Sequence, residues 1–214
     1  ERFINNPRHI EVQVVGDSHG NAIHIGERDC SLQRRHQKVI EESPAILLND
    51  ETRAKLHDVA VKATKYLKYE GAGTFEFLAD DKQNIFFMEM NTRLQVEHPV
   101  SEMVSGIDIV ELMIKVAEGE KVPPQESIKF KGHAIECRIT AEDPNSFLPS
   151  PGKVTQWMVP GGRNVRVDSH VYTNYVVPPY YDSMIGKLIV WGRDRNKAIN
   201  IMKRALAEFE VEGI

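Results

Sequence analysis

Two short apolar segments that each carry a carboxylate constrain this chain most strongly. Residues 74–78 read Thr-Phe-Glu-Phe-Leu and residues 85–90 read Ile-Phe-Phe-Met-Glu-Met, with the turn at residues 80–84 between them. Such runs favour strands, and a tight turn between two strands predicts an antiparallel pair. Burying a carboxylate in an apolar strand without a partner is costly. Glu76 and Glu89 therefore predict a cation beside them, either an Arg or Lys side chain or a metal ion.

The residues that follow the second strand continue this polar pattern. Five polar side chains alternate with other residues: Glu89, Asn91, Arg93, Gln95 and Glu97. An extended backbone would project all five to one side. Glu76, Glu89 and Asn91 offer hard oxygen ligands, which suit Mg²⁺ or Mn²⁺ better than Zn²⁺. The alternative is that the carboxylates face solvent, but two of them on neighbouring strands, followed by an amide, favour the metal site.

Arg93 and Glu97 extend the predicted site toward a small anion. The planar guanidinium of Arg93 can hold a carboxylate or bicarbonate through two parallel hydrogen bonds. Glu97 is a candidate general base, because a positioned carboxylate can accept a proton from an anion that an arginine holds. A simple salt bridge between Arg93 and Glu97 explains the same pattern equally well.

Hydrophobic periodicity predicts further strands in the first half of the chain. We expect them at residues 9–15, 22–27 and 39–42, with a polar loop at residues 28–38. In the first of these strands the apolar residues alternate with Glu11 and Gln13, which is typical of a strand with one buried face. The strand that leads to Glu89 is strongly apolar, so we expect it to be buried.

Two helices are expected in the same half. Asn49 or Asp50 can cap one helix, whose apolar stripe continues to Leu67. A capping box formed by Asp108 and Glu111 begins the second helix.

The composition changes near residue 123, after two consecutive prolines. Beyond that point we expect strands at residues 131–140, 153–158, 164–171 and 184–191, and a helix from residue 194. We therefore divide the chain into two domains, residues 1–122 and 123–214.

Bulk composition excludes several classes of protein. The 214 residues carry a formal net charge of -4, so no nucleic-acid partner is expected. No apolar run approaches the roughly 20 residues that a membrane span needs, so no membrane partner is expected either. Cys30 and Cys137 lie far apart without metal-ligand spacing, and we expect two buried reduced thiols in a cytoplasmic protein. The chain begins without Met inside an expected strand, so we expect a piece of a longer protein.

The run from Phe87 to Val100 closely resembles the signature of biotin carboxylase, a member of the ATP-grasp superfamily. Further matching motifs lie along the whole chain, at residues 7–13, 27–38, 71–76, 136–139, 149–152 and 179–187. The resemblance implies an α+β fold. Residues 1–122 would form the C-terminal half of an ATP-grasp domain, an antiparallel sheet with flanking helices. Residues 123–214 would form a small β-rich C-terminal domain, incomplete at its end.

The resemblance also implies an activity and the residues that carry it. In this family ATP phosphorylates bicarbonate to carboxyphosphate, which delivers CO₂ to N1 of biotin on a carrier protein. By motif match, Glu97 would deprotonate bicarbonate, Lys38 would lie at the bicarbonate and phosphate end, and Arg138 would stabilise the biotin enolate. An oxyanion that develops on the ureido ring needs a fixed cation, which supports the role of Arg138. Bicarbonate would be held by Arg93, Gln95 and the backbone of Val96, and the metal by Glu76, Glu89 and Asn91.

Nucleotide contacts are implied in the same way. The hinge at residues 1–4, including Glu1 and Ile4, would meet the adenine. The other implied nucleotide-binding residues are His9, Gln33, His36, Lys38, Glu76 and Glu89. A structural role is at least as good an explanation for His9 and His36 taken alone, and Asp182 receives no catalytic role.

Cofactors and partners follow from the family. They are ATP, Mg²⁺ or Mn²⁺, bicarbonate, and biotin on a biotin carboxyl carrier protein, together with a carboxyltransferase component and a second copy in a homodimer. Arg166 matches an interface arginine, whereas Arg163 stands where some similar bacterial subunits have an aromatic residue. Acetyl-CoA carboxylase is the first choice for the parent enzyme and pyruvate carboxylase the second.

Besides Arg163, the 214 residues depart from the family because they hold no glycine-rich phosphate loop. Residues 71–73 and 161–162 are turns without the spacing that such a loop needs. We therefore expect that these residues alone do not turn over ATP. Two other functions stay open: another ATP-grasp ligase, such as carbamoyl phosphate synthase, or a non-catalytic dimerisation or carrier-docking module. Arg138 and the motif at residues 149–152 favour biotin carboxylase.

Overall fold

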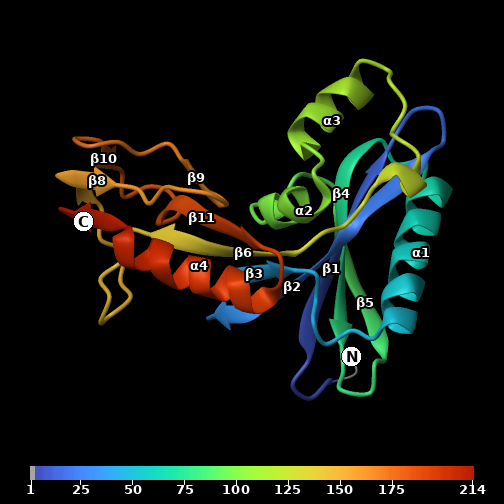
Figure 1. The fold of residues 1–214 in the computed structure, drawn as a ribbon, viewed down its shortest axis with the longest axis horizontal. Coiled ribbons are helices and arrows are strands. Elements are labelled where there is room, and N and C mark those ends of the chain that lie inside the picture. Colours follow the sequence, from blue (N-terminus) through green and yellow to red (C-terminus); the bar gives the residue numbers. More distant parts are fainter. Residues whose placement is uncertain (1–2) are drawn as a thin grey trace.

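The computed structural model describes residues 3–214, and one antiparallel sheet of eight strands runs through it (Figure 1). The spatial order of the strands is β5-β4-β1-β2-β3-β6-β11-β9. Their bounds are β1 Arg8–Gly16, β2 Ala22–Arg34, β3 Gln37–Ser43, β4 Gly71–Ala79, β5 Ile85–Asn91, β6 His133–Thr140, β9 Val165–Ser169 and β11 Met184–Gly192. Two small sheets pair β7 (Gly152–Lys153) with β10 (Val176–Val177) and β8 (Gln156–Met158) with β12 (Glu210–Glu212). The expected α+β class is confirmed.

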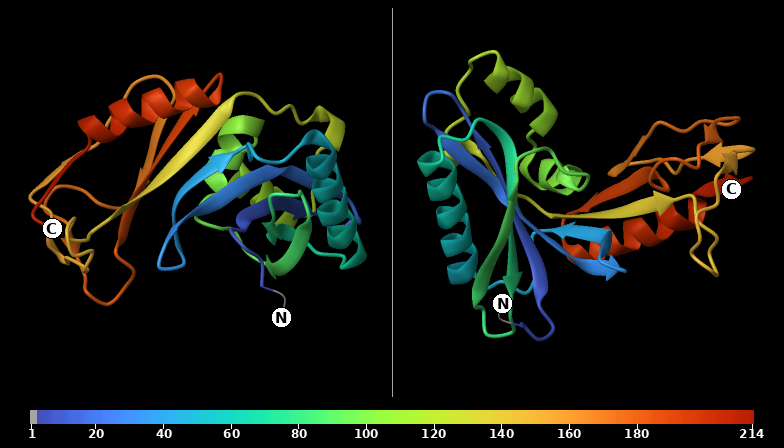
Figure 2. Two further views of the ribbon diagram at one scale, coloured as in Figure 1. Left: turned by 90° about the horizontal axis from the view of Figure 1, so that it is seen from below. Right: turned by 180° about the vertical axis from the view of Figure 1, so that it is seen from behind.

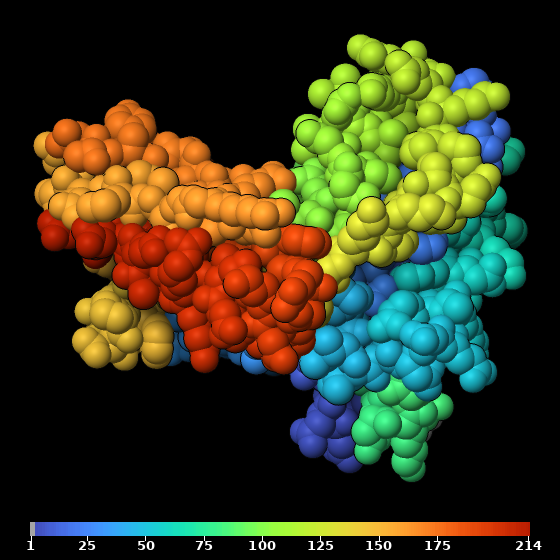
Figure 3. Space-filling model, viewed as in Figure 1, coloured from blue at the N-terminus to red at the C-terminus, as the bar shows by residue number. Residues whose placement is uncertain are grey.

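Helices cover both faces of the large sheet (Figures 1 and 2). They are α1 Asp50–Tyr66, α2 His98–Ser105, α3 Ile109–Ala117 and α4 Arg195–Glu208, with a 3₁₀ turn η1 at Gln125–Ser127. Leu56 and Ala60 of α1 pack on Val12 and Phe75 of the sheet, whereas α2 lies on the other face. In the C-terminal part α4 and α2 pack on opposite faces of β6 and β11. The space-filling view shows the C-terminal third as one lobe beside the larger N-terminal lobe (Figure 3).

The helix starts follow the capping residues that the sequence offers. Asn49 Oδ1 accepts a hydrogen bond from the backbone N–H of Thr52 at 2.7 Å, and Asp108 Oδ1 accepts one from Glu111 at 2.8 Å. Each side chain satisfies a backbone donor that has no partner within its helix. Both predicted caps are confirmed. The short helix α2 was not expected.

The predicted polar loop at residues 28–38 is wrong. β2 continues to Arg34 and β3 begins at Gln37, so only Arg35 and His36 form the turn, with φ of 51° and 64°. Two residues with positive φ match the twist of a tight hairpin. The predicted strand at residues 153–158 is also wrong, because Val154 and Thr155 bond to different neighbours, Tyr175 and Glu212, and divide it.

Several further expectations concern the chain as a whole. Cys30 and Cys137 are buried and free, as expected. No helix within residues 3–214 is long and apolar enough to cross a membrane. The division between residues 122 and 123 stays a prediction. The chain between α3 and β6 contains this point, while residues 40–43 of β3 pair directly with residues 134–137 of β6.

Candidate functional site

A row of charged side chains crosses one face of the sheet. It contains one residue from each of four neighbouring strands, and consecutive members are direct register partners: Arg28 on β2, Glu11 on β1, Glu76 on β4 and Glu89 on β5. Directly opposed residues of antiparallel strands share a face, so the row stands on one side of the sheet. The other side carries the apolar residues that pack under α1. The fold thus gathers one cation and three carboxylates on a single surface.

Arg28 anchors this row from a fully buried position. Its guanidinium donates to Glu11 Oε2 at 3.1 Å, to Gln13 Oε1 at 2.7 Å and to Gln95 Oε1 at 2.9 Å. Burial disfavours its charge, but the carboxylates of Glu11 and Glu97 outweigh burial and raise the pKa of Arg28. The expectation that Glu11 and Gln13 face solvent is wrong, since both are buried. They turn inward because they satisfy the donors of Arg28.

Glu97 lies between two cations. Lys38 Nζ is 2.8 Å from Glu97 Oε1, and Arg138 donates to Glu97 Oε2 at 3.0 Å. Lys38 also contacts Glu11, and its Nζ lies 3.2 Å from Glu76 Oε1. Burial alone would lower the pKa of Lys38, but Glu11 and Glu97 raise it above its ordinary value. Lys38 therefore stays protonated and joins Glu97 to the row.

His9 is a second cation on the row. Its Nε2 lies 2.9 Å from Glu76 Oε2 and 3.1 Å from Glu11 Oε1. Burial lowers the pKa of His9, but its contacts with the carboxylates of Glu11 and Glu76 outweigh burial and raise the pKa to about 9. The ring is thus an imidazolium at neutral pH. Gln33 Nε2 lies 3.4 Å from the other ring nitrogen of His9.

The predicted metal ligands lie together at the end of the row. Asn91 Nδ2 is 2.9 Å from Glu76 Oε1 and 3.2 Å from Glu89 Oε1, so the amide occupies the position between two carboxylates. A cation in that position would meet hard oxygen ligands from both strands, and a rotated amide would present its oxygen to it. These side chains fit a magnesium or manganese ion.

A cavity of ≈ 900 Å³ opens over these groups. Its walls include the predicted residues His9, Gln33, His36, Lys38, Glu76, Glu89, Asn91, Arg93, Gln95, Val96, Glu97 and Arg138. Asp182 also lines it, whereas Ile4 does not, and Glu1 lies outside the described residues. Residues that are widely separated in the sequence therefore share one hollow.

The expected alternation from Glu89 to Glu97 is wrong beyond Asn91. β5 ends there, and Glu97 occupies the position before α2, whose second residue is a proline. A proline in the first turn favours a helix start and prevents a continued strand. Gln95 and Glu97 are buried, whereas Glu89 and Arg93 are exposed. The five side chains reach the cavity from a strand, a loop and a helix start rather than from one strand.

One further expectation about this run is wrong, and so is the salt bridge that was the alternative to an anion site. The strand that leads to Glu89 is not buried, because β5 is the edge strand of the sheet and Phe87 is 61% exposed. No ion pair between Arg93 and Glu97 occurs in residues 3–214. Instead Arg93 donates to the backbone oxygen of Leu94 at 3.2 Å and to Asn91 Oδ1 at 3.5 Å, and its side chain lines the cavity.

Two of the residues predicted to bind bicarbonate are held firmly. Gln95 Nε2 donates to Glu76 Oε1 at 2.7 Å while its oxygen accepts from Arg28, so its side chain is fixed. The backbone oxygen of Val96 accepts from Lys187 Nζ at 2.8 Å. This loop therefore has a defined shape beside Glu97.

Several residues of the site were missed from the sequence. They are Glu11, Arg28, Glu41, Glu136 and Lys187. One signal in the sequence could have found Glu11 and Arg28. Glu11 and Gln13 lie on one predicted strand and Arg28 follows the next, and a hairpin places Glu11 opposite Arg28. Glu41 and Glu136 gave no local signal, because their strands are far apart in the sequence.

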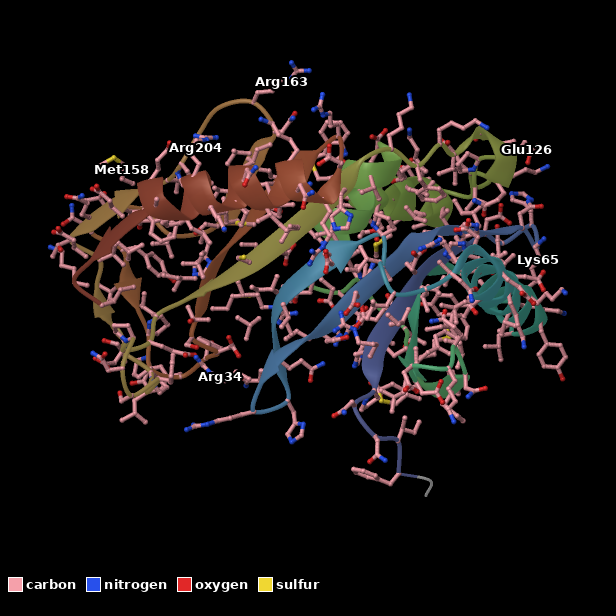
Figure 4. The ribbon with its side chains drawn as sticks, turned by 60° about the horizontal axis from the view of Figure 1, so that its bottom comes forward. Arg34, Lys65, Glu126, Met158, Arg163 and Arg204 are labelled. Carbon is pink, nitrogen blue, oxygen red and sulfur yellow. The ribbon has the colours of Figure 1, made fainter. Side chains whose placement is uncertain are left out.

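The hairpin of β2 and β3 reaches the C-terminal lobe at its tip. Arg34 projects from this tip in Figure 4. Its guanidinium pairs with Glu142 and lies 4.6 Å from the ring centroid of Phe147. The hairpin that carries Gln33, His36 and Lys38 is thus fixed to the loop that follows β6.

Comparisons with known proteins cover both parts of the chain. A family model described as the ATP binding domain of the carbamoyl-phosphate synthase L chain matches residues 1–125, and one described as the biotin carboxylase C-terminal domain matches residues 136–214. The biotin carboxylase of Nostoc sp. is 56% identical over 216 residues, which cover 100% of this chain and 48% of that protein.

Solved structures give the same result. A biotin carboxylase complex with βγ-ATP from Campylobacter jejuni superposes with a TM-score of 0.98 at 69% identity, covering 100% of this chain and 48% of that one. The biotin carboxylase domain dimer of 2-oxoglutarate carboxylase from Hydrogenobacter thermophilus, solved with MgADP, ADP and bicarbonate, gives 0.97 at 51% identity with the same coverage. The chain thus spans about half the length of these proteins.

Proposed function

The chain belongs to the biotin carboxylase family of the ATP-grasp superfamily, and from this premise we propose that it forms the bicarbonate, metal and biotin-facing part of a biotin carboxylase. The reaction is the ATP- and bicarbonate-dependent carboxylation of biotin on a carrier protein through carboxyphosphate. One observation carries the proposal. Glu97 lies at the wall of the cavity with Lys38 on one oxygen and Arg138 on the other.

The first step is the activation of bicarbonate. Arg93 holds the anion at the open side of the cavity, beside Gln95 and the backbone of Val96. Glu97 takes the proton of bicarbonate, and the freed oxygen attacks the terminal phosphorus of ATP. Carboxyphosphate forms as the bond to ADP breaks. Lys38 lies where charge builds up on the transferred phosphoryl group.

The second step is the transfer of CO₂. Carboxyphosphate breaks down to CO₂ and phosphate, the N1 proton of biotin passes to the phosphate, and N1 attacks CO₂. Negative charge develops on the ureido oxygen of biotin during this step. Arg138 supplies a fixed cation there, oriented by its bonds to Glu41 and Glu97.

Glu76, Glu89 and Asn91 would hold a magnesium or manganese ion. When bound, the metal supplies positive charge that neutralises phosphate oxygens. The biotin carboxylase domain of Hydrogenobacter thermophilus was solved with MgADP and bicarbonate, which supports the same ligands for this chain. His9, Gln33 and His36 line the cavity on the side of the hairpin and are proposed nucleotide contacts. Ile4 and Glu1 remain proposed contacts of the adenine.

We assign the partners from the family. They are a biotin carboxyl carrier protein, a carboxyltransferase component and a second copy of the full-length protein, in a cytoplasmic acetyl-CoA carboxylase or, as second choice, a pyruvate carboxylase. Arg166 is already paired within the chain, at 2.6 Å to Glu102 and 2.8 Å to Asp168. Arg163 lies on a loop and points away from the rest of the chain (Figure 4). Arg163 is therefore the freer of the two for a partner.

The test is an assay of the full-length protein with ATP, bicarbonate and biotin. We expect ADP release that depends on both biotin and bicarbonate. Dependence on ammonia instead of biotin would point to a carbamoyl phosphate synthase-like ligase, and no turnover at all would point to a dimerisation or docking module. The 214 residues by themselves are expected to show no bicarbonate-dependent ATP hydrolysis, since they contain no glycine-rich phosphate loop.

A further inference from the structure

A second pair of opposed carboxylates lies behind the cavity. Glu41 on β3 and Glu136 on β6 are direct register partners, so their side chains share a face of the sheet. Both residues are 0% exposed. Arg138 follows Glu136 by two residues and therefore projects from the same face. The pair lies directly beside the arginine that contacts Glu97.

The pair has few partners for its four oxygens. Glu41 Oε1 accepts from Arg138 Nε at 2.7 Å. Within residues 3–214, Glu41 Oε2 and both oxygens of Glu136 have no hydrogen-bond partner. Buried polar atoms are almost always paired, so three such atoms at one place require an explanation.

Neighbouring charged groups do not supply that explanation. Lys187 on β11 donates to the backbone oxygen of Val96 and lies 3.6 Å from Asp168. On α2, His98 bonds to the backbone of Gln95 and Glu102 pairs with Arg166. The remaining charged groups are the carboxylates of Glu97 and Glu11 and the guanidinium of Arg138, which pair with one another or with the row. Among the described residues no cation forms a hydrogen bond or ion pair with Glu136, although the charges of Lys187 and Arg138 oppose the rise in its pKa.

One proton on the pair satisfies these atoms. Two ionised carboxylates cannot lie side by side in a buried position without a large cost. A protonated Glu136 removes one charge, and its hydroxyl can donate to Glu41 Oε2. The ionised member is Glu41, because Arg138 bonds to it. Burial and the Glu41 charge raise the pKa of Glu136 well above its ordinary value, and burial raises the pKa of Glu41 to about 7 although Arg138 opposes this.

We propose that Glu41 and Glu136 share a single proton and that this acid–carboxylate pair positions Arg138 against Glu97. Loss of the proton would place a second negative charge beside Arg138 and draw its guanidinium away from Glu97. Glu136 is thus a positioning residue that acts through Glu41. The effect of this pair on carboxylation rests on the proposed function. The shared proton itself does not.

The proton can be observed in the 214-residue chain without any activity. Infrared spectroscopy at about pH 8, above the pKa of about 7 for Glu41, should show the carbonyl band of a buried protonated carboxylic acid, since free Glu side chains are ionised there. Glu136→Gln should abolish the band. Glu41→Gln should keep it at a shifted position, because Glu136 remains buried and neutral. A wild-type spectrum without the band would overturn the proposal.

Glu42→Gln is the matched control for this experiment. Glu42 is the next residue on β3, but it faces the other way and is bonded to His133 at 2.7 Å and Arg195 at 2.6 Å. Burial disfavours its charge, but these partners hold the pKa of Glu42 at about 2. The band should be unchanged in this variant. Its loss in Glu42→Gln would assign the proton elsewhere and overturn the proposal.

A second measurement tests positioning. The ¹⁵N resonance of Arg138 Nε should follow the deprotonation of the pair as the pH rises, and it should lose this titration in Glu136→Gln. A pair that only fills space would leave the resonance of Arg138 independent of Glu136, which would overturn the positioning role.

The full-length protein links the pair to catalysis. Its biotin-dependent ADP release should decline at alkaline pH, and Glu136→Gln should move this decline. Absence of biotin-dependent turnover together with the protonated band would reject the proposed function and keep the shared proton. If the full-length protein turns over biotin but Glu136→Gln leaves the alkaline decline in ADP release unchanged, the positioning role is rejected and the proposed function is kept.

Discussion

The molecule contains two directly opposed glutamate pairs, and their surroundings differ. Glu76 and Glu89 pair between β4 and the edge strand β5, beside a cavity, with Lys38, His9 and an amide nearby. Glu41 and Glu136 pair between two interior strands, and Arg138 bonds to Glu41 but not to Glu136. The strand register alone produces both pairs. We call Glu76 and Glu89 the open pair and Glu41 and Glu136 the closed pair. The donors and the access of water decide whether the charge is met by a cation or by a proton.

The largest expected effect concerns Glu97, which lies between the two pairs. Glu97→Gln in the full-length protein should slow biotin-dependent ADP release about 10²- to 10⁴-fold, because an amide cannot take the proton of bicarbonate. Glu111→Gln, an exposed carboxylate of α3 that pairs with Lys115, is the control. Wild-type turnover in Glu97→Gln would remove the assignment of the base.

A comparable loss should appear in the free energy of unfolding when the charged row beside the open pair loses Arg28, its anchor. Arg28→Met leaves the buried carboxylate of Glu11 without its fully buried cation, and we expect a loss of about 3–5 kcal/mol in the free energy of unfolding. Urea denaturation of the chain measures this. Arg204→Met removes an exposed pair with Glu208 and should change stability by less than about 1 kcal/mol. Equal effects of the two variants would show that the row is not a structural anchor.

Glu42 is a buried carboxylate with hydrogen-bond donors, and its contribution to stability should respond to pH differently from that of the closed pair. Its partners lower the pKa of Glu42 to about 2 in the folded state, below the value of about 4.3 for an unfolded chain. Its stabilisation is therefore present above about pH 4.3 and is lost as the pH falls through about 2. Glu42→Gln should cost about 2 kcal/mol at neutral pH and little in acid, measured by urea unfolding.

The closed pair should show the opposite behaviour of a carboxyl group. Glu136 has a raised pKa in the folded state, so the fold binds a proton that the unfolded chain releases above about pH 4.3. Stability should therefore fall as the pH rises above that value, and Glu136→Gln should remove this part of the slope. An identical slope in wild type and Glu136→Gln would mean that Glu136 is ionised when folded.

The smallest expected effect concerns metal affinity at the open pair. Glu89→Gln removes one charged ligand but keeps the amide and Glu76, so we expect Mn²⁺ to bind roughly tenfold more weakly, about 1.4 kcal/mol. Titration of the full-length protein with Mn²⁺ in the presence of ADP, followed by electron paramagnetic resonance, measures this. Glu126→Gln, exposed in η1, is the control. Unchanged affinity in Glu89→Gln would place the metal elsewhere.

The sequence could predict the open pair because its determinants are local. A single turn at residues 80–84 brings Glu76 and Glu89 into register, and the apolar neighbours make two carboxylates conspicuous. The helix caps at Asn49 and Asp108 are local for the same reason.

Burial of polar side chains could not be predicted in this way. Glu11 and Gln13 follow the pattern of a solvent face, but Arg28 bonds to both of them and also donates to Ser101 of the later helix α2. The closed pair depends on pairing between β3 and β6, which no short-range pattern specifies. The end of β5 at Asn91 could have been predicted only if Pro99, which favours a helix start, had been given more importance than the alternation of polar residues.

The ladder between β3 and β6 also has a mechanical consequence. Lys38 and Glu41 lie on β3 and Arg138 lies on β6. The groups around Glu97 therefore belong to one hydrogen-bonded pair of strands. Separating Lys38 from Arg138 would break backbone hydrogen bonds along residues 40–43. The groups around Glu97 are therefore expected to keep their relative positions when a substrate binds.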